Sequence, residues 1–170
     1  MKIKKIDSLK DNCIQVIIET PKHSTCKYDF DFDLELFYLD KMLPLGMNFP
    51  YDFGFIPGTK GEDGDPLDVL LLMDAPLLQG VLVSCRVIGI LKAMQTEQDG
   101  QKFRNDRFVA VTDLCVQYKN IQDIIDLNTD ARNEIEEFFR QYNSVAGKTF
   151  QSLGWQGSSE ALQMIKSQLV

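Results

Sequence analysis

The strongest constraint on the fold is a run of four carboxylates, Glu62-Asp63-Gly64-Asp65-Pro66-Leu67-Asp68, that leads directly into the apolar segment Val69-Leu70-Leu71-Leu72-Met73. Like charges this close repel one another, so folding them together costs stability unless a positive group neutralises them. Hard divalent cations bind oxygen ligands, and Mg²⁺ in particular combines a few carboxylates with substrate phosphates. The run therefore predicts a metal site on a turn that a buried strand anchors.

The run has two other interpretations. An EF-hand loop requires an oxygen ligand at position 5 and glycine at position 6, but Leu67 and Asp68 stand there, so that match fails. An acidic surface turn between two strands explains the run about as well as a metal site when the run is considered alone. Asp68 favours the metal site, because it lies against an apolar strand where a surface turn needs no further carboxylate.

The apolar period changes along the chain. Ranges 13–19, 27–34, 36–39, 69–73, 81–91 and 108–111 have the composition or the alternation of strands, and Gln98-Asp99-Gly100 is typical of a hairpin tip. Ranges 130–142 and 159–169 have helical spacing, 118–126 fits a short helix, and the glycines at 154 and 157 predict a loop between the two longer helices. Strands followed by helices predict an α+β fold on a small antiparallel barrel, as one domain over residues 1–170.

Composition limits the classes of function. The net charge of -7 argues against a nucleic-acid partner, and no apolar run approaches the roughly 20 residues that span a membrane. The basic N-terminus is not followed by an apolar segment, so no signal peptide is predicted. Four widely spaced cysteines and a single histidine argue against a zinc site and predict reduced thiols in a cytoplasmic protein.

Two segments, Asn48-Phe49-Pro50-Tyr51-Asp52-Phe53-Gly54-Phe55-Ile56-Pro57 and Asp63-Gly64-Asp65-Pro66-Leu67-Asp68-Val69-Leu70, closely resemble the signature of soluble family I inorganic pyrophosphatases. The resemblance covers most of the chain. It implies a five-stranded OB-type antiparallel β-barrel with C-terminal helices packed outside. It also implies hydrolysis of pyrophosphate to two phosphates by a metal-activated water, with several Mg²⁺ ions per active site, in a homo-oligomer that is often a hexamer in bacteria.

The resemblance also implies roles for individual side chains. The metal ligands would be Asp63, Asp65, Asp68 and Asp106, and Asp65 would also accept the proton of the attacking water. The substrate-binding residues would be Lys27, Lys41, Phe53, Arg107 and Tyr142. Glu19 and Asp29 would lie in the outer shell of the same cavity. These residue types suit the reaction, because pyrophosphate is highly charged and its hydrolysis needs charge cancellation and a base.

Several positions depart from the family pattern. Lys41 stands where arginine is usual, Phe53 replaces a tyrosine whose hydroxyl reaches the substrate, and Asn143 replaces a lysine. The arm from 92 to 106 usually carries a further metal-binding aspartate, but no carboxylate occurs between Lys92 and Glu97.

The arm's other ligand is Asn105 or Asp106, and we expect Asp106 because it is a carboxylate. Periodicity alone makes Tyr142 a core aromatic residue. Lys148 is either a third basic contact or an ordinary loop lysine, and we expect the latter. These departures keep open the alternative of a catalytically impaired relative that acts as a phosphate-, metal- or OB-type binding module.

Overall fold

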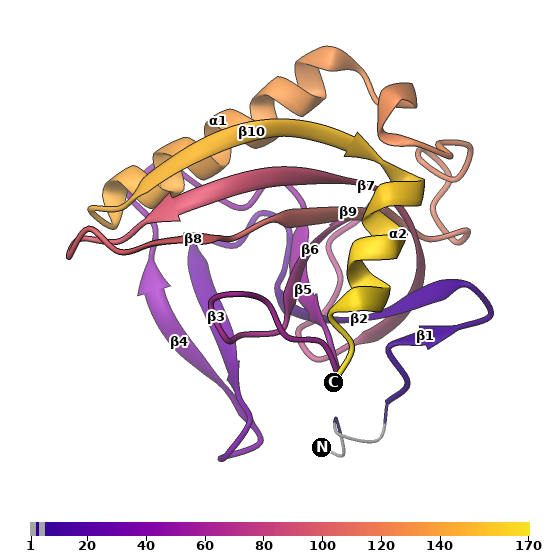
Figure 1. The fold of residues 1–170 in the computed structure, drawn as a ribbon, viewed down its shortest axis with the longest axis horizontal. Helices are drawn as coiled ribbons and strands as arrows, with labels where there is room; N and C mark the ends of the chain where they lie inside the picture. Colours follow the sequence, from indigo (N-terminus) through magenta and orange to yellow (C-terminus); the bar gives the residue numbers. More distant parts are fainter. Residues whose placement is uncertain (1–2, 4–5) are drawn as a thin grey trace.

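A closed ring of five strands forms the centre of the molecule (Figure 1). The computed structural model describes residue 3 and residues 6–170. The ring runs in the order β2 (Cys13–Thr20), β5 (Asp52–Ile56), β6 (Leu67–Leu72), β9 (Arg107–Val111) and β7 (Leu82–Thr96), and β7 pairs back onto β2. The prediction of a five-stranded barrel is confirmed. The β6–β9 pairing is parallel, so the sheet is mixed and not wholly antiparallel.

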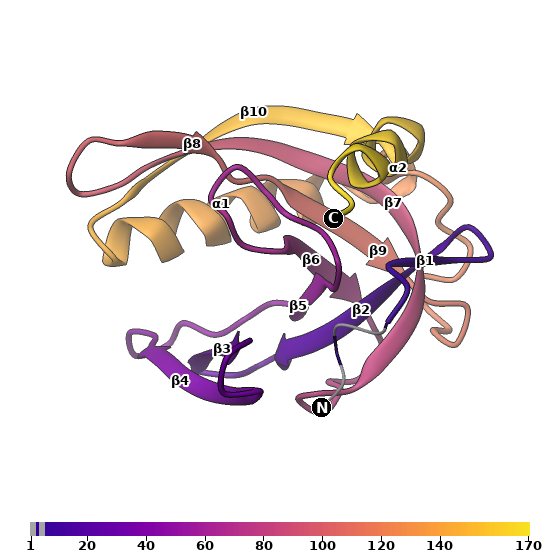
Figure 2. The same cartoon turned by 60° about the horizontal axis from the view of Figure 1, so that its bottom comes forward.

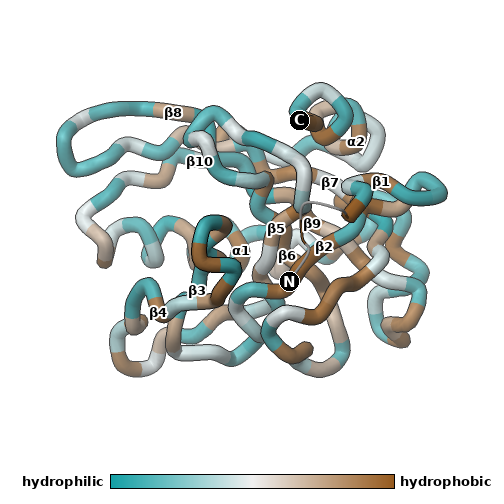
Figure 3. Tube along the Cα trace, turned by 90° about the horizontal axis from the view of Figure 1, so that it is seen from below, coloured by the Kyte–Doolittle hydropathy of each residue, from teal (hydrophilic) through white to brown (hydrophobic). Residues whose placement is uncertain are grey.

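β5, β6 and β9 are buried along almost their whole length because both of their faces are covered. Alternate residues of β6 divide between two cores. Val69 and Leu71 pack in the core that includes Ala161 and Ile165 of α2 (Ser158–Ser167). Leu70 and Leu72 pack in the core that includes residues of α1 (Thr129–Val145). Figure 3 shows hydrophobic colour concentrated along these central strands.

Two glycines allow close approaches that the ring requires. A Cβ on Gly54 of β5 would lie 2.0 Å from the carbonyl oxygen of Ile17 in β2. Gly89 lies at a register shift where β7 bends between its pairings, and a Cβ there would lie 2.6 Å from the Ile124 side chain. Both distances are too short for any larger residue, so glycine is required at each position.

The remaining elements extend the ring. β1 (Leu9–Lys10) pairs with β2, and β8 (Lys102–Arg104) pairs with the end of β7 as a hairpin arm. β3 (Cys26–Asp31) and β4 (Leu36–Met42) form a separate two-stranded hairpin. Figure 2 shows this hairpin opposite α1 and β8, with the loop between β5 and β6 lying between them. No helix among the described residues is long and apolar enough to cross a membrane.

The structure corrects three local predictions. The segment expected as a loop between the helices is β10 (Thr149–Gly157), which pairs with β7 and absorbs Gly154 at a register shift. β5 was not predicted, because the glycine in its centre hides the strand pattern. Range 118–126 is mostly irregular and contains only the 3₁₀ turn η2 (Ile124–Asp126). The predicted helix at 130–142 is confirmed and extended, with Asn128 as its N-cap.

Candidate active site

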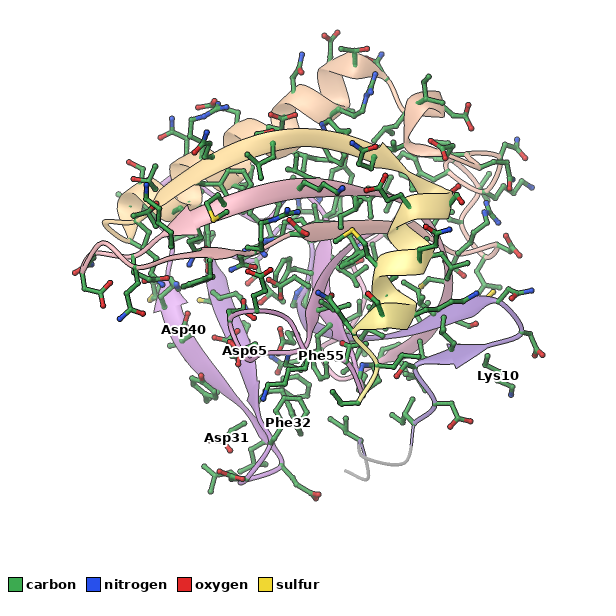
Figure 4. The ribbon with its side chains drawn as sticks, viewed as in Figure 1. Lys10, Asp31, Phe32, Asp40, Phe55 and Asp65 are labelled. Carbon is green, nitrogen blue, oxygen red and sulfur yellow. The ribbon has the colours of Figure 1, made fainter. Side chains whose placement is uncertain are left out.

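A cleft of about 450 Å³ opens between the β3–β4 hairpin, the β5–β6 loop, the end of β7 and the C-terminal half of α1. Asp40 of β4 and Asp65 of the β5–β6 loop both line it (Figure 4). Seven carboxylates line the cleft, namely Glu19, Asp29, Asp40, Asp63, Asp65, Asp68 and Glu97, against four cations, namely Lys27, Lys41, Arg107 and Lys148. This excess of negative charge on a concave wall favours bound cations.

The acidic run supplies three of these carboxylates. Pro66 and Gly64 end the β5–β6 loop, and the first residues of β6 then fix Asp68 opposite Phe55 of β5. The backbone N–H of Asp65 donates to Asp63 Oδ1 over 3.2 Å, which holds the turn. Within the described residues, the Asp65 carboxylate itself has no hydrogen bond or ion pair. Asp65 therefore presents two free acceptor oxygens to the cleft.

Arg107 neutralises one of the three carboxylates. Its Nη1 lies 2.7 Å from Asp68 Oδ2, and its guanidinium stacks over the Phe139 ring at 5.0 Å. Burial raises the pKa of Asp68 to about 6, although Arg107 and Lys27 lower it. Arg107 is therefore needed to keep Asp68 charged and able to bind a cation at neutral pH.

The predicted outer-shell carboxylates flank Lys27. Lys27 Nζ lies 3.5 Å from Glu19 Oε2 and hydrogen-bonds Asp29 Oδ1. Burial disfavours the charge on Lys27, but Glu19 and Asp29 outweigh it, so the pKa of Lys27 rises above its ordinary value. Lys27 thus stays protonated. The solvated-face interpretation of this strand does not hold at Lys27, because its side chain is buried and lines the cleft.

Aromatic rings form the floor beneath two of the lysines. Lys27 Nζ lies 5.0 Å from the Phe53 ring and Lys41 Nζ lies 5.0 Å from the Tyr142 ring. Burial raises the pKa of Tyr142, so its hydroxyl remains a hydrogen-bond donor at neutral pH. Tyr142 also stacks on Phe138, so it serves as a packed aromatic residue and lines the cleft as well. All five predicted substrate-binding residues line the cleft.

The choice of Asp106 as the arm ligand is not supported by its position. Asp106 does not line the cleft. Its Oδ1 accepts from the Ala93 N–H at 2.8 Å, and both of its oxygens accept from the Arg104 guanidinium. Neighbouring residues of an extended chain point to opposite sides, so it is Asn105 that faces the cleft.

Several polar cleft residues were not assigned to the site from the sequence. Gln95 of the arm lines the cleft, and so does Asp40, which pairs with Lys41 at 3.1 Å. Lys148 is not an ordinary loop lysine, because it lines the cleft and pairs with Glu97 at 2.9 Å. The spacing of Gln95, Glu97 and Lys148 in the sequence does not predict that they meet, because the pairing of β10 with β7 is what brings the loop after α1 to the hairpin arm.

Burial of Glu19 gives the metal-free protein a pH-dependent stability. Its Oε1 accepts the Phe30 N–H at 2.9 Å, yet burial raises the pKa of Glu19 to about 7. Since the folded protein holds this proton more tightly than the unfolded chain does, the stabilisation is complete below pH 4.5 and is lost as pH rises to 7. Glu19→Gln is expected to reduce this loss, which amounts to roughly 3 kcal/mol. Urea unfolding from pH 4.5 to 7.5 measures it.

A matched control is Glu134→Gln, because Glu134 is exposed on α1. The control variant is expected to keep the pH slope of the wild-type protein. An identical slope for Glu19→Gln would assign the pH dependence to other carboxylates.

The donor set fits a hard divalent cation. The acidic run offers only oxygen ligands, and the Asp65 carboxylate has no protein partner among the described residues. Among the described residues, no three acidic, histidine or cysteine side chains lie close enough together to hold an ion by themselves. Mg²⁺ does not need such a group, because it keeps several waters and is usually held by one or two carboxylates and substrate phosphates.

Comparisons with known proteins agree with this geometry. The family model described as inorganic pyrophosphatase matches residues 16–169. Inorganic pyrophosphatases from Nostoc sp. and Corynebacterium efficiens are 36% and 39% identical, covering 92% and 89% of this chain and 89% and 93% of their own. The crystal structure of inorganic pyrophosphatase from Thermus thermophilus superposes with a TM-score of 0.88 at 34% identity, covering 98% of this chain and 96% of that one. The chain therefore belongs to the inorganic pyrophosphatase family.

Proposed function

We propose that this chain hydrolyses inorganic pyrophosphate to two phosphates in the cleft, with Mg²⁺ as the cofactor. The observation that carries the proposal is the arrangement of charge: three carboxylates of the acidic run, Asp63, Asp65 and Asp68, line the same cleft as the cations Lys27, Lys41 and Arg107. Carboxylates alone would repel a diphosphate, and cations alone would leave no place for a metal. A site that takes metal and phosphate together needs both.

Each side chain has a separate role in the proposed hydrolysis. Mg²⁺ bound at Asp63, Asp65 and Asp68 would lower the pKa of a bound water and neutralise charge on the diphosphate. Asp65, with both carboxylate oxygens free of protein partners among the described residues, accepts the proton of the attacking water. Lys27, Lys41, Arg107 and the Tyr142 hydroxyl donate to phosphate oxygens and stabilise charge on the leaving phosphate.

Phosphate release from pyrophosphate tests the activity and its metal requirement. We expect release with Mg²⁺, none after chelation with EDTA, and recovery when Mg²⁺ is restored in excess. Parallel assays with Mn²⁺ and Ca²⁺ establish which ion the site prefers. Binding of pyrophosphate without release under any of these ions would contradict the proposal and support the alternative, a phosphate- or metal-binding module.

The assembly and its location are also inferred. Several large apolar side chains on or next to the β3–β4 hairpin are exposed, namely Leu34, Leu36, Leu39, Met42 and Leu45. Exposed apolar side chains at the edge of a two-stranded hairpin support a homo-oligomer, with a hexamer as the state implied by the family, and light scattering measures its mass. All four cysteines are free thiols, which supports a cytoplasmic location that cell fractionation can check. We treat residues 1–170 as one domain.

A further inference from the structure

One wall of the cleft carries two carboxamides between two cations. Gln95, at the end of β7, is 5% exposed, and Asn105 stands between β8 and β9. Arg107, 4% exposed, lies at one end of this wall, and Lys148 lies at the other. The proposed hydrolysis of pyrophosphate assigns no step to either amide.

The side chains of this wall form one continuous hydrogen-bond chain. Arg107 Nη1 donates to Asn105 Oδ1, Asn105 Nδ2 donates to Gln95 Oε1 at 3.1 Å, and Gln95 Nε2 donates to Glu97 Oε1 at 2.6 Å. At the other end of this hydrogen-bond chain, Lys148 Nζ forms an ion pair with Glu97 Oε2 at 2.9 Å. We call these five residues the amide relay.

The two ends of the amide relay fix its direction. Arg107 has only donors, and an ionised Glu97 has only acceptors, so each amide must present its oxygen toward Arg107 and its nitrogen toward Glu97. Both amide oxygens are therefore already bound by a donor. Each amide nitrogen keeps one further N–H, because a carboxamide has two and the relay uses one.

This wall is chemically unlike the acidic turn. The turn offers charged oxygens, including the free carboxylate of Asp65. The relay instead offers two amides with engaged oxygens and spare N–H donors, and both oxygens of its one carboxylate, Glu97, are already bound by Gln95 and Lys148. Metal ions prefer the first kind of surface and phosphate oxygens the second.

We propose that the amide relay binds a phosphate group directly and takes no metal ion of its own, with Gln95 and Asn105 as positioning residues that hold Arg107 and Lys148 toward that phosphate. This assignment rests on the proposed function, since it divides the same cleft into a metal side and a phosphate side. It predicts that a carboxylate in place of either amide converts part of the phosphate side into a metal site.

Asn105→Asp tests this division, because it adds one negative charge and removes both amide N–H donors without changing the side-chain size. Mn²⁺ is titrated calorimetrically into the metal-free protein, and inorganic phosphate is titrated separately without metal. We expect one more Mn²⁺ equivalent than in the wild-type protein, and phosphate binding weaker by about ten-fold or more. Gln95→Glu is measured in the same way, so that the test survives if one variant does not fold.

The matched control is Asp106→Asn, because it changes the adjacent residue, whose carboxylate lies outside the cleft. We expect it to leave the Mn²⁺ equivalents unchanged. An unchanged Mn²⁺ count in Asn105→Asp, or unweakened phosphate binding, would overturn the assignment. Neither titration measures turnover, so failure of the assignment is distinguishable from failure of the proposed hydrolysis, which the pyrophosphate assay decides.

Discussion

Asp65→Asn is expected to lower kcat for pyrophosphate hydrolysis by about 10²- to 10⁴-fold, the range that a positioned general base contributes. Asparagine keeps the size of the side chain but cannot accept the proton of the attacking water, and it is a weaker ligand for a hard cation. The fold should be retained, because only the Asp65 backbone has a partner among the described residues. Steady-state phosphate release, compared with urea unfolding, measures both properties.

The matched control for this variant is Glu62→Gln, which removes another carboxylate of the same acidic run. Glu62 does not line the cleft, and its Oε2 accepts from the Arg104 N–H at 3.2 Å. We expect Glu62→Gln to change kcat by less than about three-fold, as for a peripheral surface charge. If both variants lost activity equally, the net charge of the run would matter and Asp65 would have no special role.

Arg107→Met is expected to reduce both activity and stability. It removes the donor that faces the phosphates, for a loss of about 10²- to 10³-fold in kcat. It also leaves Asp68 without its partner in a buried setting, at a cost of about 3–5 kcal/mol in the free energy of unfolding. The pKa of Asp68, already raised by burial, should rise further, so metal binding should weaken most at acidic pH.

Arg107→Lys separates charge from shape in the same position. Lysine restores a positive charge opposite Asp68 but cannot reproduce the planar contact with the Phe139 ring or the several bonds made by Nη1. We expect it to recover most of the stability and at least a tenth of the wild-type kcat. A lysine variant as damaged as Arg107→Met would mean that the geometry of the guanidinium, and not its charge, is required.

The sequence alone was sufficient to predict those features that depend on residues close together in the chain. Repulsion within 62–68, followed by a run that must be buried, identified the acidic turn, and that turn does line the cleft. The helix at 130–142 was predicted from its period, because its apolar side chains recur on one face. β5 was not predicted because Gly54 interrupts its strand pattern. Glycine is required there because the Ile17 backbone comes close, and this is a contact between distant parts of the chain.

The tertiary structure alone decided which polar side chains enter the site. Whether Asn105 or Asp106 faces the cleft depends on the register of β8 against β7, because a shift of one residue would turn every side chain of the strand to the opposite face. Gln95, Glu97 and Lys148 come together because β10 pairs with β7 over a long separation, and the pKa of Glu19 is raised by burial that only the closed ring creates. The sequence by itself thus determined the charges and periods, whereas strand register and burial determined which of those charges meet.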